Sequence, residues 1–286
     1  MLGGALISAL NGAVSKILSD DMSAMEIVFF RNLLGIVLIL FALKIRPPKL
    51  RGGKWYLLLT RGFLGFLAMI LFFYTITTIP LGEAITLNKT SPFFVTILAY
   101  YLLKEQLNFT TILALFIGFL GILLIVKPIG MSISYEHFLG VLGGFFAAAA
   151  YTTIKKIKDI YDSRIIMLSF VGVGTLLPAL FFLSAPYVEA PLALAFLFPE
   201  FSYPHTLRIW SLILFMACIA TLSQWLLTKA YSSSKLSIIG VVSYTNIPFA
   251  IGFGWMLGDV FPDGVTFLGI AFIVLGGFLV GKKSHK

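Results

Sequence analysis

Four basic residues stand inside long apolar stretches of the sequence, where charge is rare; they are Arg31, Arg61, Lys89 and Lys229. No carboxylate lies as deep as Arg31 or Lys89, because Glu26 and Glu83 stand close to the ends of their stretches. Charge inside apolar segments is costly and is usually kept for function. Cations without an acidic neighbour attract an anionic or zwitterionic solute and repel a simple cation. We therefore expect Arg31, Arg61 and Lys89 to bind a substrate.

Two of these cations have an alternative role in folding. Arg31 could pair with Glu26 or with a backbone carbonyl. Arg61 stands nearer the end of its apolar stretch, from which a long side chain can extend to lipid headgroups. The sequence leaves both roles open at Arg31 and Arg61, and it favours binding at Lys89.

Polar residues precede a proline at two places in otherwise apolar stretches, Thr86–Pro92 and Ser243–Pro248. Proline removes a helical hydrogen bond and frees the carbonyl four residues before it, here that of Asn88 or Tyr244. Interrupted helices at matching positions in two halves of a chain point to the central site of a transporter. The alternative is that these polar side chains only repair the helix locally. We expect a site that includes Thr90, Tyr244 and Asn246.

Further polar side chains share single helix faces. Ser8, Asn11 and Ser15 are spaced three and four residues apart, and so are Thr221, Gln224 and Thr228. Such groups line a wet cavity or hydrogen-bond between helices, and packing is the commoner role for Ser and Thr. The complete candidate binding set is Asn11, Arg31, Arg61, Lys89, Thr90, Tyr151, Gln224, Tyr244 and Asn246. The three histidines and one cysteine are far apart, and no phosphate-binding glycine loop is present, so we expect no catalytic residue, metal or cofactor.

The elements that position these residues follow from composition. The chain of 286 residues is 59% apolar and only 12% charged, with a mean hydropathy of +1.00. Soluble proteins carry about twice that charged fraction, roughly 25%. A membrane-spanning helix needs about 20 apolar residues. We expect an all-α membrane protein with ten transmembrane helices, at 1–18, 25–45, 55–79, 84–103, 109–127, 137–157, 164–184, 208–231, 237–257 and 264–282.

The basic residues between these helices fall mostly on one side. That side holds Lys44, Arg46, Lys49, Arg51, Lys54, Lys104, Lys155, Lys156, Lys158, Arg164, Lys235, Lys282, Lys283 and Lys286, and the other holds Lys16, Lys127 and Arg208. Basic residues concentrate in cytoplasmic loops. We therefore expect a multi-pass protein of the cell (inner) membrane with both termini cytoplasmic. The net charge of +9 then reflects topology, so no nucleic-acid partner is expected.

The two halves of the sequence resemble each other. Leu2-Gly3-Gly4 pairs with Leu142-Gly143-Gly144, and the same spacing pairs Lys16 with Lys156 and Asn11 with Tyr151. Farther along, Pro92-Phe93 pairs with Pro248-Phe249, and Glu105 falls close to Asp259. Each half holds five expected helices, an odd number, so the second half must be inverted in the membrane. We expect two inverted repeats, 1–127 and 137–282, around a central cavity, as in many secondary transporters.

The segment Ser15-Lys16…Ser23…Glu26…Phe29-Phe30-Arg31 resembles the drug/metabolite transporter superfamily, EamA type. The paired segments Pro92…Glu105…Gly121 and Pro248…Asp259…Gly269…Gly276 carry the same resemblance. It covers essentially the whole chain, and its motifs are specific to fold rather than to substrate. The resemblance implies a ten-helix carrier with a central cavity that moves small metabolites, often outward.

Transport is the function that these observations favour. We expect a secondary transporter, an exporter or exchanger, of a small anionic or zwitterionic organic metabolite in the lipid bilayer, working by alternating access. The alternative is a membrane-embedded enzyme acting on a lipid or lipid-linked substrate, which needs a nucleophile, a metal cluster or a paired acid and base. The sequence leaves the substrate, the direction, the coupling and the oligomeric state open.

Overall fold

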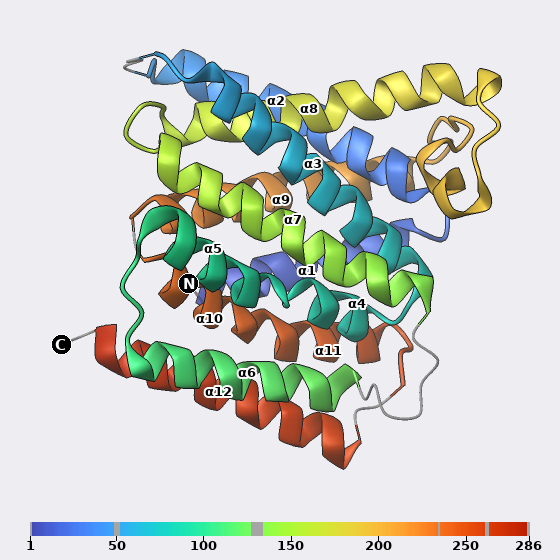
Figure 1. The fold of residues 1–286 in the computed structure, drawn as a ribbon. Helices are drawn as coiled ribbons and strands as arrows, with labels where there is room; N and C mark the ends of the chain where they lie inside the picture. The colour runs from blue at the N-terminus through green and yellow to red at the C-terminus, as the bar shows by residue number, and fades with distance from the viewer. Residues whose placement is uncertain (1, 49–51, 127–133, 234, 261–262, 285–286) are drawn as a thin grey trace.

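In the computed structural model, all the regular structure within residues 2–48, 52–126, 134–233, 235–260 and 263–284, the residues that the structure describes, is helical. This confirms the expected all-α class. In chain order the α-helices are α1 (Leu2–Leu18), α2 (Ala24–Ile45), α3 (Trp55–Thr78), α4 (Leu81–Asn88), α5 (Ser91–Leu103), α6 (Phe109–Val126), α7 (Tyr135–Ile157), α8 (Ser163–Ser184), α9 (Leu207–Ser233), α10 (Leu236–Val242), α11 (Asn246–Met256) and α12 (Gly264–Ser284) (Figure 1).

Three short 3₁₀-helices complete the described part: η1 (Ala185–Tyr187), η2 (Leu192–Leu197) and η3 (Ser243–Thr245). The first two lie in the proline-rich connection between α8 and α9. Four of the basic residues that were assigned to the two sides of the membrane, Lys49, Arg51, Lys127 and Lys286, lie outside the described residues.

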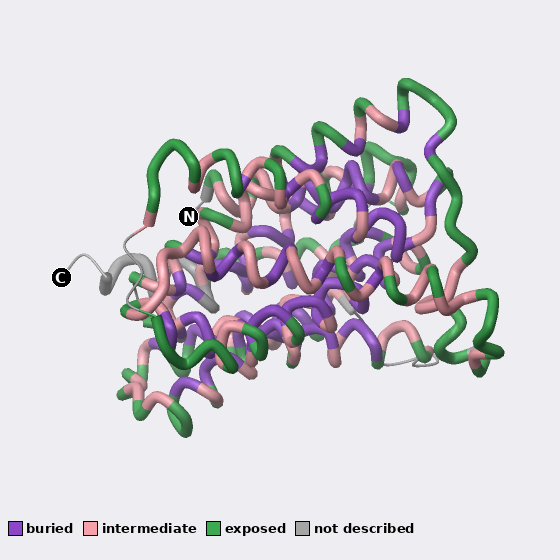
Figure 2. The backbone as a smooth tube through the Cα atoms, turned by 90° about the horizontal axis from the view of Figure 1, so that it is seen from above, coloured by how far each residue is buried: buried purple, intermediate pink, exposed green. Residues whose placement is uncertain are grey.

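Five of the described helices are long and apolar enough to cross a membrane: α2, α3, α7, α8 together with η1, and α9. The apolar parts of α1, α6 and α12 are shorter, namely Gly3–Leu18, Phe109–Ile125 and Gly264–Gly276. Figure 2 shows buried backbone running through the middle of the bundle, whereas the connections and the outward faces are exposed. Large apolar side chains such as Phe41 and Phe116 are exposed on these outward faces, as in a protein surrounded by lipid.

Two stretches expected as single helices, 84–103 and 237–257, are each divided. The first separates into α4 and α5 next to Pro92, and the second into α10, η3 and α11 next to Pro248. Because Pro92 has no N–H, the chain tightens before it, and the Thr90 N–H donates to the Leu87 carbonyl at 3.0 Å. The Thr90 hydroxyl donates to the same carbonyl at 2.8 Å. Thr90 therefore repairs the helix locally.

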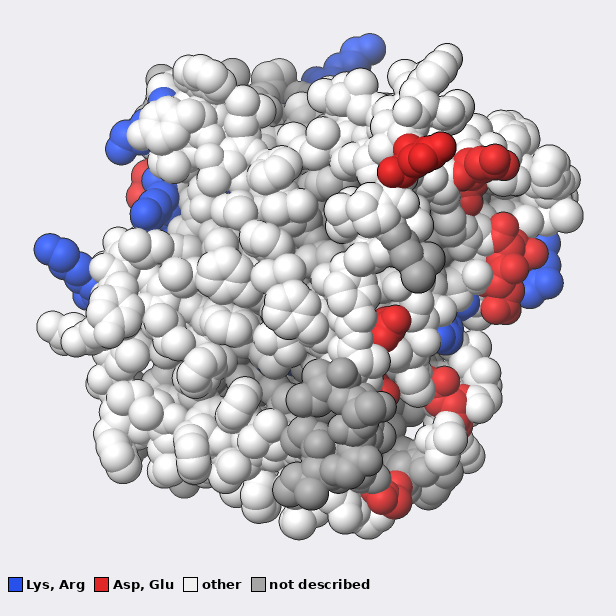
Figure 3. All heavy atoms as spheres, turned by 45° about the vertical axis from the view of Figure 1, so that its right-hand side comes forward, with Lys and Arg blue, Asp and Glu red and all other residues white. Residues whose placement is uncertain are grey.

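Most charged residues separate toward the two ends of the bundle by the sign of their charge. One end, here called the acidic end, carries Asp20, Asp21, Glu83, Glu136 and Asp259, and the opposite basic end carries Lys44, Lys54, Lys104, Lys155 and Lys158. In Figure 3 acidic side chains gather on the right of the visible face, and several basic ones protrude on the left. The helix directions follow from this: α1 and α3 run toward the acidic end, and α2 and α4 run away from it.

Two carboxylates cap the divided helices reciprocally. Asp259, which follows α11, accepts a hydrogen bond from the Leu81 N–H at 2.9 Å, at the start of α4. Glu105, which follows α5, accepts one from the Leu236 N–H at 3.3 Å, at the start of α10. A carboxylate at a helix start satisfies a free N–H group and interacts favourably with the helix dipole. Each half of the chain thus caps the divided helix of the other half.

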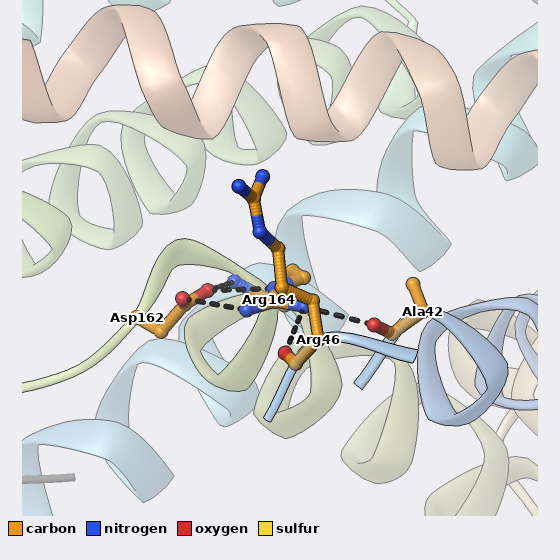
Figure 4. Close-up of polar contacts among 4 residues, drawn as sticks. All are labelled: Ala42, Arg46, Asp162 and Arg164. Carbon is orange, nitrogen blue, oxygen red and sulfur yellow. Dashed lines mark hydrogen bonds and ion pairs between the residues drawn. The ribbon is translucent and has the colours of Figure 1, made fainter. Parts of the chain in front are cut away.

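A third polar cluster fastens α8 to α2 at the basic end (Figure 4). Asp162 caps α8 by accepting from the Arg164 N–H at 2.8 Å, and its carboxylate pairs with the Arg164 guanidinium at 2.9 Å. The same guanidinium donates to the carbonyls of Ala42 and Arg46 at 2.9 and 2.7 Å, at the end of α2. The hydrogen bonds that the Arg164 side chain and backbone donate to Asp162 hold the pKa of its carboxyl below its usual value.

Replacing Asp162 by alanine is expected to lower the free energy of unfolding by about 1 kcal/mol at neutral pH, since a cap and a partly exposed ion pair are lost together. Because the pKa of Asp162 is lower in the folded state, its contribution is complete at neutral pH and is lost as the pH falls through that lowered pKa. Thermal unfolding of the detergent-solubilised variant at neutral pH and at about pH 3 checks this. A difference from wild type that is equally large at both pH values contradicts it, and Asp159→Ala, at an exposed acid of the same connection, is the control.

Candidate functional site

A cavity of about 1050 Å³ lies in the middle of the bundle. Its walls come from α1, α2, α3, α7, α8 and α9, and from the divided helices on both sides, α4 and α10 to α11. It extends from the buried Arg31 and Arg61 to the exposed Gly3, Lys229 and Ser233 at the basic end. Its volume is at the upper end of the roughly 300–1,000 Å³ found for small-molecule sites. The cavity is therefore large enough for an organic molecule.

The cavity brings together most of the residues that the sequence singled out. Seven line it: Asn11, Arg31, Arg61, Lys89, Tyr151, Gln224 and Asn246. Thr90 and Tyr244 do not. Thr90 is directed to the Leu87 carbonyl, and Tyr244 is fully buried against α6, where a methyl group at Gly118 would lie 2.5 Å from its ring.

Arg61 points into the bundle rather than toward its basic end. Only 1% of the residue is exposed, and its guanidinium carbon lies 4.7 Å from the centre of the Phe170 ring. Its terminal nitrogen lies against Gly65, one turn farther from the basic end, where a methyl group would overlap both Arg61 and Phe170. The alternative in which Arg61 extends to lipid headgroups is therefore wrong. Gly65 leaves the space that this guanidinium occupies.

Arg31 enters the same region from α2. Its guanidinium carbon lies 5.6 Å from the centre of the Phe73 ring and 6.0 Å from that of Phe170. One terminal nitrogen approaches the Met69 sulfur at 2.7 Å and donates to the Asn32 amide oxygen at 3.3 Å. These are neutral partners, so the positive charge of Arg31 is not balanced by them.

Glu26 is not the partner of Arg31, so that alternative is wrong. Its carboxylate accepts from the Ser23 N–H and hydroxyl at 2.8 Å each, which closes a capping box at the start of α2. The other carboxylate oxygen accepts from the Ser202 N–H at 2.6 Å. Glu26 thus serves the fold at the acidic end.

Four cations line the cavity; Lys229 lies at its exposed mouth, and the three deeper ones lack acidic partners. Within the described part of the chain, no carboxylate lies within 4.0 Å of the charged groups of Arg31, Arg61 or Lys89. The Arg31 Nε and the Arg61 Nε and Nη1 have no hydrogen-bond acceptor. An unpaired buried charge is strongly unfavourable. These donors are therefore available to an anion that enters the cavity.

Apart from Lys229 at the exposed mouth, the other polar side chains of the wall are neutral. The Tyr151 ring stacks on that of Tyr231 with 4.3 Å between centres, and Gln224 donates to Thr228 at 3.4 Å. Asn11 and Asn246 each have an amide oxygen without a partner. Ser15, on the same face as Asn11, donates to the Asn11 carbonyl instead and serves packing. Among the described residues, no group of three or more His, Cys, Asp or Glu is arranged to hold a metal ion.

Sequence reasoning missed the aromatic part of the site. Phe73 and Phe170 line the cavity beneath the two guanidinium groups. The chain contains 28 phenylalanines, most of which suit a lipid-facing or core position, so nothing in the sequence marked these two. Gly65 was also missed, because its role depends on Phe170, a neighbour on another helix.

Direct contacts close the cavity at the acidic end. His137 Nε2 on α7 lies 2.7 Å from the Glu83 carboxylate on α4, and Ser134 lies 2.7 Å from the other ring nitrogen. The Lys16 ammonium on α1 donates to the carbonyls of Ile76 and Ile79 at 2.8 and 3.0 Å, at the end of α3. The contact of His137 with Glu83 and the cap from Asp259 to Leu81 join helices of the first and second halves, whereas the Lys16 hydrogen bonds join two helices of the first half.

The Gly-Gly pairs of the two halves lie in different surroundings. A methyl group at Gly143 would lie 3.3 Å from the Leu71 Cβ, and one at Gly144 would lie 3.1 Å from the Asn88 carbonyl oxygen. The corresponding glycines of α1 are open: a methyl group at Gly3 meets nothing within 4 Å, and one at Gly4 meets only Leu226, at 4.0 Å. The bundle is thus tightly packed around one pair and hollow beside the other.

The comparisons with known proteins agree with this architecture. The profile of the EamA-like transporter family matches residues 1–127. The pseudopaline exporter of Pseudomonas aeruginosa is 32% identical over 286 residues, which cover 99% of this chain and 95% of the exporter. The riboflavin transporter of Vibrio cholerae is 27% identical over 233 residues, 81% of this chain and 72% of that protein.

A crystal structure of another protein has the same fold, with a TM-score of 0.72 over 98% of both chains and 15% sequence identity. The family assignment depends on the sequence matches, which confirm the resemblance noted in the sequence. The chain is a multi-pass membrane protein that belongs to the EamA-like transporter family of the drug/metabolite transporter superfamily.

Proposed function

We propose that this protein is a secondary transporter that carries a small anionic or zwitterionic organic metabolite across the bacterial inner membrane by alternating access. The observation that carries the proposal is the cavity in which Arg31, Arg61 and Lys89 lack acidic partners. The family and the names of the relatives are those of transporters, which favours transport over the alternative of a membrane-embedded enzyme. The exporter among these relatives fits an outward direction or exchange.

The proposed topology has ten spanning segments, with α4–α5 and α10–α11 each counted as one, in two inverted repeats, 1–127 and 137–282. The reciprocal caps support the repeats, because Glu105 and Asp259 correspond in the sequence and act at the same place in opposite halves. The separation of charge supports an orientation with both termini and the basic end in the cytoplasm. In that orientation the cavity faces inward.

The Gly-Gly pairs suggest how the cavity changes sides. In the inward-facing state, Gly143 and Gly144 pack closely against α3 and the break between α4 and α5, while Gly3 and Gly4 stand beside the opening. If the two halves exchange conformations, α1 closes onto α9 through Gly3 and Gly4, and α7 separates from α3. The substrate then meets the outside, which is alternating access as inverted repeats allow it.

A charge test addresses the proposed substrate. Thermal unfolding of the purified protein is measured with amino acids, nucleotides, cofactors and organic cations. Anionic or zwitterionic compounds are expected to stabilise the protein, and Arg61→Gln is expected to remove that stabilisation. If only cations stabilise the protein and Arg61→Gln leaves the stabilisation unchanged, the proposed charge of the substrate is wrong.

Replacing His137 by alanine is expected to open the outer end more often. The variant loses the 2.7 Å contact with Glu83, a contact that holds α7 to α4. The measurement uses a Cys218→Ser background with Ala68→Cys on the cavity wall, and a membrane-impermeant thiol reagent added outside spheroplasts. Labelling is expected to become at least about tenfold faster, as for the loss of one hydrogen bond to a charged group.

The control for this prediction is Asp20→Asn, which removes an exposed acid at the same end. When it is added to the Ala68→Cys background in place of the His137 substitution, the labelling rate is expected to stay unchanged. Equal labelling with and without the His137 substitution would show that this contact does not hold the outer end closed.

A further inference from the structure

The cavity has more positive charge than a singly charged solute can balance. Arg31, Arg61 and Lys89 all line it, and all three come from the first half of the chain. No aspartate or glutamate is among the described residues of its wall. A solute with one acidic group leaves most of this charge unpaired, which is unfavourable in a buried site. A solute with at least two acidic groups balances it better.

The cations form two anchor points on different elements. Arg31 from α2 and Arg61 from α3 converge on the same ring, Phe170 of α8, and form the first. Lys89 forms the second, where α4 ends before Pro92. No hydrogen bond or ion pair holds the Lys89 ammonium within the described residues. Two groups of donors on different elements suit two acidic groups on one molecule.

The surface between these anchors suits an organic body. Aromatic rings of Phe72, Phe73 and Tyr151 line the cavity together with the neutral amide of Gln224. A volume of about 1050 Å³ far exceeds that of an inorganic anion. Arginine pairs bind carboxylate and phosphate through two parallel hydrogen bonds, whereas lysine acts as a single point charge.

We propose that the substrate is an organic molecule with two separate acidic groups, carboxylate or phosphate, one held by Arg31 and Arg61 and the other by Lys89. This inference rests on the proposed transport function and narrows it from one anionic group to two. It assigns a separate task to each anchor, because Lys89 contributes only when the second acidic group is present.

The test uses aromatic probes that differ only in their acidic groups. Binding of terephthalate, benzoate, phenylene bisphosphonate and phenyl phosphate is measured calorimetrically with the full chain in phosphatidylcholine nanodiscs. Terephthalate is expected to bind at least about tenfold more tightly than benzoate, as for one added charge-assisted contact. Lys89→Gln is expected to remove this advantage and to leave benzoate binding unchanged, and Lys89→Arg is expected to restore it. If terephthalate binds more tightly than phenylene bisphosphonate, the acidic groups of the substrate are carboxylates; the reverse order indicates phosphates.

The control is Lys229→Gln, which removes an equal charge at the exposed mouth, where Lys229 lies over Trp225. It is expected to leave the preference for terephthalate intact. Equal affinity for terephthalate and benzoate in the wild type, equal loss of both in Lys89→Gln, or phenyl phosphate binding as tightly as phenylene bisphosphonate would overturn the two-anchor proposal. Transport of a singly acidic solute would survive these results, so failure here is distinguishable from failure of the proposed function.

Discussion

Replacing Arg61 by glutamine is expected to lower transport at least about 100-fold, the loss of two charge-assisted hydrogen bonds in a buried site. The same change is expected to raise the melting temperature of the substrate-free protein. Arg61 is 1% exposed, and its Nε and Nη1 have no acceptor, so the folded state bears an unpaired buried charge. Removing that charge is expected to stabilise the folded state, although the contact with Phe170 is lost.

A fall in transport together with a rise in melting temperature distinguishes a residue that binds substrate from one that stabilises the fold. Arg164 is a structural arginine, fully paired at the basic end. Replacing it by glutamine is therefore expected to lower the melting temperature. Arg61→Lys keeps the charge and is expected to keep part of the transport. A lower melting temperature in Arg61→Gln, together with unchanged substrate stabilisation of the variant, would assign Arg61 to the fold.

Replacing Gly144 by alanine is expected to destabilise the protein by about 2 kcal/mol, the range for overpacking. The added methyl group would overlap the Thr90 hydroxyl and lie 3.1 Å from the Asn88 carbonyl oxygen and 3.2 Å from the Ser91 N. The neighbouring helix break must shift, and Lys89 with it. Substrate-dependent stabilisation is therefore expected to fall along with the melting temperature.

The matched variant Gly4→Ala is the same change at the corresponding position of the first half. Its methyl group meets only Leu226, at 4.0 Å, so thermal stability and substrate binding are expected to be unchanged. If α1 closes onto α9 during transport, Gly4→Leu is expected to slow turnover without weakening binding. Unchanged turnover in Gly4→Leu would contradict closure at this place, and equal destabilisation by both alanines would contradict the difference between the two glycines.

The position of the charged residues could be predicted from the sequence because charge is rare in apolar helices. Arg31, Arg61 and Lys89 needed no information beyond that rarity, and all three line the cavity. Their directions could not be predicted. Arg61 turns inward only because Gly65 and Phe170 leave it space, and those neighbours lie on another turn and another helix.

Thr90 and Tyr244 show what a proline in the sequence cannot predict. A proline indicates that a helix is interrupted, which the division at Pro92 and Pro248 confirms, but it does not indicate which neighbouring side chain faces the cavity. At the first break Asn88 and Lys89 line the cavity, and the Thr90 hydroxyl returns to the backbone. At the second, Ser243 and Asn246 line it, and Tyr244 packs toward α6. Rotation about the helix axis decides this, and it depends on packing between distant segments.

The pairing of Glu105 with Asp259 could be read from the two halves, whereas their hydrogen-bond partners could not. Each carboxylate reaches the start of a helix in the opposite half, Leu236 or Leu81. Those contacts depend on how the halves interlock. The sequence therefore predicted which two carboxylates correspond, and the structure shows that each one caps a helix of the opposite half.

Solute counterflow in proteoliposomes tests the central claim most directly. The full chain is reconstituted, loaded with one unlabelled compound at a time, and exposed to the labelled form outside, with and without a pH gradient. We predict counterflow of anionic or zwitterionic organic compounds, none of organic cations, and loss of the signal in Arg61→Gln. Counterflow of cations, or equal counterflow by wild type and Arg61→Gln, would contradict it.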